Sequence, residues 1–284
     1  MRKKLLALIM ITFIAQPSWC WEKIGSASTD PGYSRLVFPL FSLGQCVIGK
    51  GNLYSGMSLL APYWYQNHDL FVTPGAIYGI SDPVTVQLYL PVSIDSYAPE
   101  DKKSIGLGNI IGGFEWAYYV KKNNGSYTQA TIFNQYKIPV SSKIPELTSG
   151  AIDVLIGSTI AHNSPSFYTF ASTALLIPTW HNNMRKGYNF FYEFGIGPII
   201  TKKEGTLFSI FMEIDGIFST SDINNPSPCD NTLENNVIWI GPVGYWSFKN
   251  FIAQFGIQAP LTQHYEQISD KRNVRIGASL YFKF

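Results

Sequence analysis

The last twelve residues of the chain, 273–284, alternate between apolar and polar side chains without interruption. Successive side chains of a β-strand point to opposite faces of its sheet, so this segment predicts a strand with one wholly apolar face. Such a face packs on a protein core or contacts lipid. The apolar set is Val274, Ile276, Ala278, Leu280, Phe282 and Phe284, and the opposing set is Arg275, Gly277, Ser279, Tyr281 and Lys283.

The first twenty residues have the pattern of a secretory signal peptide. Arg2, Lys3 and Lys4 precede an apolar run at 5–15 that is too short to cross a bilayer as a helix. We therefore predict cleavage after residue 20; a lipoprotein with lipid on Cys20 is the alternative, although the residues before Cys20 suit it poorly. Losing the three basic residues changes the formal net charge from +2 to about −1, which gives no reason to expect a nucleic-acid partner.

Composition favours the lipid-facing alternative for the alternating segment. Aromatic residues make up 15% of the chain and charged residues only 14%, against roughly 25% charged residues in soluble domains. No stretch after the signal approaches the roughly 18 apolar residues of a transmembrane helix. The composition is typical of a sheet with one face toward lipid.

Alternating segments recur from about residue 53 to the end of the chain, and the loops between them are alternately short and long. Short periplasmic turns and longer external loops are typical of outer-membrane barrels. The prediction is an all-β fold: a transmembrane antiparallel β-barrel of about twelve strands over 53–284, with a soluble β-sandwich as the alternative. The segments are 53–65, 68–80, 84–94, 107–121, 127–141, 150–162, 166–178, 187–201, 206–220, 235–247, 251–263 and 272–284.

Residues 21–52 have no clear assignment. They could form a plug inside the barrel, an extra strand or a periplasmic lead-in. Cys46 and Cys229 are the cysteines left after cleavage, and an oxidising periplasm would permit a disulfide between them. Two separate thiols are an equally good interpretation.

Charged residues on the polar faces of the strands are predicted to point into the barrel, because lysine or arginine facing mid-bilayer lipid costs about 2–4 kcal/mol. They could line a pore that selects solutes or form salt bridges that brace a narrow barrel. Aromatic residues near strand ends, among them Tyr127, Tyr168 and Tyr245, are expected at the lipid interfaces. The predicted lumen-facing residues are Glu115, Lys137, Asp153, Glu193, Glu213, Asp215, Arg275 and Lys283.

No motif fixes a catalytic or cofactor site. A histidine such as His264 with Ser269 could serve a lipid-cleaving enzyme at the outer rim, but any rim offers such pairs. The glycine-rich segment 106–113 lacks the strand–loop–helix setting of a phosphate-binding loop. The cysteine and histidine spacings do not suggest a metal site. We therefore expect a protein that is not an enzyme and has no cofactor.

Two resemblances add to this interpretation. The C-terminal strand with Leu280, Phe282 and Phe284 resembles the signal that the barrel-assembly machinery recognises in bacterial outer-membrane barrels. Over about 70–284 the chain also resembles the outer-membrane proteins named for the MetA pathway of phenol degradation. The matching residues are Thr73, Pro74, Tyr78, Gly79 and Asp82, then Gly106, Gly108, Asn109 and Gly113, whereas Ile138, Pro139, Val140 and Ser141 depart from that pattern.

The family resemblance implies a transporter that admits hydrophobic or aromatic compounds. We expect a bacterial outer-membrane channel for the passive passage of small solutes of this kind, with outer-membrane lipid and lipopolysaccharide as its surroundings. A structural or surface-interaction barrel acting through its external loops, chiefly 221–234, is the alternative function. A lipid-modifying barrel enzyme is the third.

Overall fold

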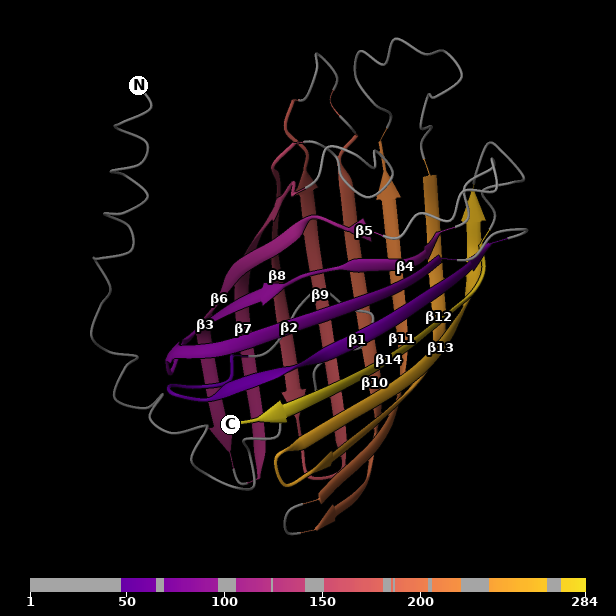
Figure 1. The fold of residues 1–284 in the computed structure, drawn as a ribbon. Coiled ribbons are helices and arrows are strands. Elements are labelled where there is room, and N and C mark those ends of the chain that lie inside the picture. Colours follow the sequence, from indigo (N-terminus) through magenta and orange to yellow (C-terminus); the bar gives the residue numbers. More distant parts are fainter. Residues whose placement is uncertain are drawn as a thin grey trace.

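The computed structural model describes residues 47–284 apart from 65–68, 97–105, 124, 141–150, 181–184, 186, 204–205, 221–234 and 265–271. The predicted signal peptide, Cys46, Cys229, His68, His181, Ser269 and the loop 221–234 therefore lie outside the described residues. The strands curve around a common axis and close into a barrel (Figure 1). They are β1 (Leu53–Trp64), β2 (Asp69–Ser81), β3 (Val84–Tyr89), β4 (Val92–Ser96), β5 (Gly106–Leu107), β6 (Ile110–Asn123), β7 (Ser126–Ile138), β8 (Asp153–Asn163), β9 (Phe167–Ile177), β10 (Asn189–Lys203), β11 (Thr206–Ser219), β12 (Asn235–Phe248), β13 (Phe251–His264) and β14 (Arg272–Lys283).

The barrel is closed by its first and last strands. β1 pairs antiparallel with β14, from Tyr54 opposite Lys283 onward, and on its other side with β2. All neighbouring pairs are antiparallel, and because β1 pairs with both β14 and β2, no spanning strand among the described residues leaves a free edge. This confirms the predicted all-β antiparallel barrel. No described segment is a helix long and apolar enough to cross a membrane.

In the described part of the chain twelve strands span the barrel, because β3 and β4 are consecutive pieces of one strand, and β5 and β6 are consecutive pieces of another. β3 and β4 both pair with β2, and they pair in turn with β6 and β5. The first break is at Leu90 and Pro91, where proline cannot donate to the strand ladder. Gly108 donates to the Pro91 carbonyl across the second break, at 2.8 Å. The predicted segments 84–94 and 107–121 were each expected to be continuous, so these interruptions are a correction.

The two ends of the barrel differ. The short hairpins β2–β3, β6–β7, β8–β9, β10–β11 and β12–β13 lie at the same end as the C-terminus. In outer-membrane barrels short turns face the periplasm. We therefore call this the periplasmic end of the barrel and the opposite end the outer end.

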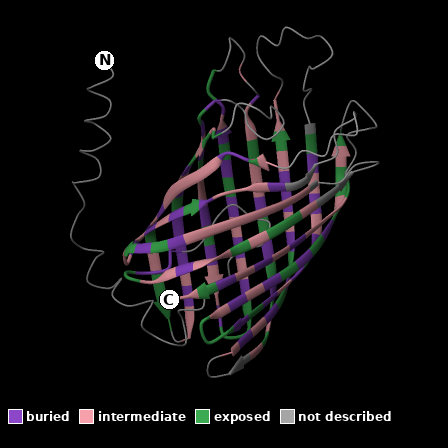
Figure 2. Cartoon of the chain, viewed as in Figure 1, coloured by how far each residue is buried: buried purple, intermediate pink, exposed green. Residues whose placement is uncertain are grey.

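The polar face of each strand points inward, and the apolar face points outward. In β3, Thr85 and Gln87 are buried, whereas Leu88 is 50% exposed. In β14, Ser279 and Tyr281 are buried, whereas Phe282 is 45% exposed. Buried and exposed residues alternate along most strands (Figure 2). A soluble sandwich buries its apolar face, so the structure excludes that alternative.

Replacing Gly195 with alanine should destabilise the barrel wall. Gly195 on β10 is the register partner of Phe170 on β9, and a Cβ atom at Gly195 would overlap the Phe170 ring. Overpacking of this kind costs about 1–3 kcal/mol. Urea unfolding in detergent micelles measures the effect. Gly244→Ala is the matched control, because the nearest atom to its Cβ is the Phe255 carbonyl oxygen at 3.7 Å; equal unfolding midpoints for the two variants would contradict the prediction.

Candidate functional site in the barrel lumen

The predicted lumen residues lie on the inward faces of strands around the barrel. Glu115, Asp153, Glu193, Glu213 and Asp215 are buried, and Lys137, Arg275 and Lys283 are partly buried. Lipid-facing neighbours are exposed, as Tyr136 and Ile138 are beside Lys137. A side chain of a barrel wall can be sheltered only on the inside, so burial indicates the lumen. The role of these residues in solute passage stays a prediction.

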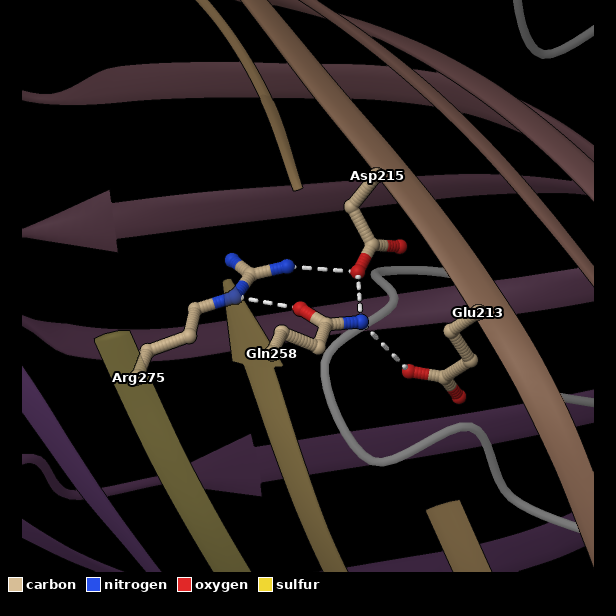
Figure 3. A network of polar contacts seen from close by, with 4 residues as sticks. All are labelled: Glu213, Asp215, Gln258 and Arg275. Atoms are coloured by element: carbon tan, nitrogen blue, oxygen red, sulfur yellow. Dashed lines mark hydrogen bonds and ion pairs between the residues drawn. The ribbon is translucent and has the colours of Figure 1, made fainter. Parts of the chain in front are cut away.

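Four polar side chains form a connected network on one wall of the lumen (Figure 3). The Arg275 guanidinium forms an ion pair with Asp215 and also donates to the Gln258 side-chain oxygen. The Gln258 amide nitrogen donates to Asp215 at 2.6 Å and to Glu213 at 3.5 Å. Arginine suits such a site because its planar guanidinium group can donate hydrogen bonds to several acceptors at once.

This network connects side chains from several strands of the C-terminal third of the barrel. Its residues come from β11, β13 and β14, and the indole ring of Trp239 on the intervening β12 lies 5.0 Å from the Arg275 guanidinium carbon. Glu193 on β10 is the register partner of Asp215. The structure therefore gathers four of the eight predicted charges, Glu193, Glu213, Asp215 and Arg275, on one wall.

The other predicted charges lie elsewhere in the lumen. Glu115 on β6 accepts a hydrogen bond from the Thr131 hydroxyl on β7 at 2.5 Å. Lys137 and Asp153 are register partners across β7 and β8. The Lys283 ammonium lies 5.9 Å from the centroid of the Tyr54 ring at the periplasmic end. The eight residues are thus a distributed lining rather than one compact site.

Sequence reasoning missed one member of the network, Gln258, and the ring beside it, that of Trp239. It selected charged residues alone, although Gln258 lies on the polar face of a clearly alternating segment, 251–261. Neutral amides on that face carried a usable signal. Trp239 lies in 235–247, where the alternation is less regular, and offered none.

An apolar and aromatic cluster fills part of the lumen at the periplasmic end. Tyr127, Tyr168 and Tyr245 belong to it and are 5%, 1% and 0% exposed. The expectation that these three tyrosines lie at the lipid interface is therefore wrong. Tyr168 on β9 packs against Phe211 on β11 on the inner surface of the wall, with ring centroids 6.1 Å apart. The buried members are Ile48, Tyr54, Ile77, Tyr89, Tyr127, Ala161, Tyr168, Phe170, Leu207, Phe211, Val243, Tyr245, Ile252 and Tyr281.

Residues 47–52 lie at this end of the barrel and form no strand; residues 47–49 are buried, whereas Lys50 and Gly51 are exposed. Val47 and Ile48 are buried, and the Ile48 amide donates to the Thr85 hydroxyl of β3 at 3.1 Å. Gly51 donates to the Gly79 carbonyl at 2.8 Å, and the Gly79 amide donates to Asn52 at 3.0 Å. The chain thus narrows its own lumen with the described end of its N-terminal segment, whereas residues 21–46 lie outside the described part.

Comparison with solved structures shows the fold. The COG4313 outer membrane channel from Pseudomonas putida F1 has a TM-score of 0.62 and 12% identity, and the match covers 86% of this chain and 97% of that one. OmpT, an outer membrane protein of Vibrio cholerae, is matched with a TM-score of 0.26 and 8% identity, over 86% of this chain and 99% of that one. No family model matches the sequence, and neither does any curated protein. The chain therefore has the fold of an outer-membrane β-barrel.

Proposed function

We propose that the protein is a bacterial outer-membrane channel for the passive passage of small solutes of apolar or aromatic character. The apolar outer face supports a place in the membrane, and the fold shared with an outer membrane channel supports transport through the lumen. The proposal includes no catalytic step and no cofactor. Assembly would depend on the C-terminal strand, where Phe282 and Phe284 point outward.

The aromatic cluster at the periplasmic end is the observation that supports a preference for apolar solutes. A hydrated ion that passed beside Tyr168, Phe211 and Tyr245 would lose water contacts without an equivalent replacement, which is costly. An apolar solute would lose no hydrogen bonds there and would gain contacts with the rings. The narrowing by residues 47–52 favours small solutes over large ones. The lumen therefore suits apolar solutes better than salts or sugars.

The lumen wall that carries Glu193, Glu213 and Asp215 should make any residual ion current selective for cations. Of the eight predicted lumen residues, five are carboxylates and three are cationic. Glu193→Gln with Glu213→Gln removes two negative charges while keeping similar side-chain shape and hydrogen bonding. The reversal potential in a KCl gradient across a planar bilayer should shift toward zero in the double variant.

The control for this experiment is Lys121→Gln, which changes charge at the exposed end of β6 outside the lumen. The control should keep the wild-type reversal potential. An unchanged reversal potential in the double glutamate variant would show that ions do not pass beside this wall.

A further inference from the structure

An arginine clamped between two aromatic rings lies at the outer end of the barrel, between β9 and β10. The guanidinium carbon of Arg185 lies 5.5 Å from the Trp180 ring centroid and 4.7 Å from that of Tyr188. Its Nε atom is buried and has no hydrogen-bond partner, and no described residue forms an ion pair with it. The lumen network already described does not include this residue.

The clamp is held in place by the backbone next to it. The Tyr188 amide donates to the Thr220 hydroxyl at 2.8 Å, and the Thr220 amide donates back to the Tyr188 carbonyl at 2.9 Å. These two bonds fix Tyr188 against the end of β11. One of the two rings beside the guanidinium is therefore attached to an ordered strand end before any ligand arrives, which lowers the entropy cost of binding.

Aromatic side chains continue from this clamp along the outer face of β10. Tyr188, Phe190, Tyr192 and Phe194 share one face by the period of two, and Phe190 and Phe194 are each 42% exposed. The Phe190 and Tyr192 ring centroids are 6.1 Å apart. A cation at the membrane rim thus lies directly beyond an aromatic column that faces the acyl chains.

This pairing fits a lipid whose phosphate lies at the outer surface and whose acyl chains run beside the barrel. Arginine donates two parallel hydrogen bonds to phosphate, and aromatic faces hold its guanidinium without neutralising it. The outer leaflet of the outer membrane supplies such a lipid. We propose that this site binds lipid A. Arg185, held beside Trp180 and Tyr188, binds a phosphate of the lipid, and the aromatic face of β10 contacts its acyl chains.

Lipid A binding to the purified full-length protein in detergent tests this site. Bisphosphorylated lipid A is titrated and the bound lipid is counted by native mass spectrometry. Arg185→Gln should bind it about tenfold more weakly than the wild type, because a charge-assisted hydrogen bond to phosphate is lost. Trp180→Ala, which removes one exposed ring of the clamp, should give a smaller loss.

Lys249→Gln is the matched control, because the Lys249 ammonium also lies over an aromatic ring, that of Phe248 at 5.4 Å, but at the periplasmic end. Lys249→Gln should bind lipid A like the wild type. Folding of each variant is checked by its heat-dependent mobility on a gel. Wild-type affinity in Arg185→Gln, or equal affinity of the wild type for lipid A without phosphates or for phosphatidylglycerol, would overturn the proposal.

Discussion

Replacing Gly79 with alanine should release residues 47–52, of which 47–49 are buried, from the periplasmic end of the barrel and raise its ionic conductance. A Cβ atom at Gly79 would overlap the carbonyl group of Gly49, and the two backbone hydrogen bonds that join Gly51 and Asn52 to Gly79 would be lost. β2 is paired on both sides along the wall, whereas residues 47–52 are held by a few bonds. The segment should therefore give way, not the strand.

Single-channel recording in a planar bilayer measures this effect. The Gly79→Ala channel should pass a clearly larger current than the wild type, with more frequent open events. Gly244→Ala serves as the control again, because the nearest atom to its Cβ would be the Phe255 carbonyl oxygen at 3.7 Å, an ordinary contact. Wild-type conductance in Gly79→Ala would show that residues 47–52 do not limit the passage of ions.

Removing Arg275 should destabilise the barrel more than any other lumen substitution. Its side chain is 12% exposed and that of its ion-pair partner Asp215 is 5% exposed. Arg275→Gln would leave Asp215 and the neighbouring Glu213 as sheltered carboxylates beside each other without their cation. Breaking one half of a buried pair typically costs about 3–5 kcal/mol, and lumen water should reduce the loss to about 3 kcal/mol.

The double variant Arg275→Gln with Asp215→Asn separates this charge effect from the loss of packing. It removes both charges and keeps amides that can hydrogen-bond to Gln258, so it should unfold at a higher urea concentration than Arg275→Gln alone. Unfolding is followed by tryptophan fluorescence in detergent micelles. If the double variant were no more stable than Arg275→Gln, an unpaired Asp215 charge would not be the cause of the lost stability.

The strand arrangement could be predicted from the sequence because each spanning strand must show one face to lipid and one to the lumen. That requirement gives the regular alternation of residues 273–284. From this alternation a strand was predicted over 272–284, and the observed β14 spans Arg272–Lys283. The interruption at Pro91 was not predicted, because the alternation continues on both sides of it. The proline alone signalled a lost ladder hydrogen bond.

The lumen was less predictable than the wall. Tyr127 has the same strand parity as Thr131 and Phe133, which places it inside, but its position near a strand end suggested an interface residue. Gln258 shares a face with Gln254 and could have been chosen on parity. The contact between Gly79 and residues 47–52 joins a strand to a segment without any repeating pattern. Such contacts depend on three-dimensional packing and leave no periodic signal.

Entry of a small apolar probe into cells tests the central proposal most directly. N-phenylnaphthylamine fluoresces in membrane interiors and crosses an intact lipopolysaccharide leaflet slowly. Cells that produce this protein should take up the probe faster than cells with an equal amount of an unrelated closed barrel of similar size, and Gly79→Ala should increase the rate further. Uptake at the rate of the unrelated barrel, with this protein shown to be folded in the outer membrane, would contradict a channel for apolar solutes.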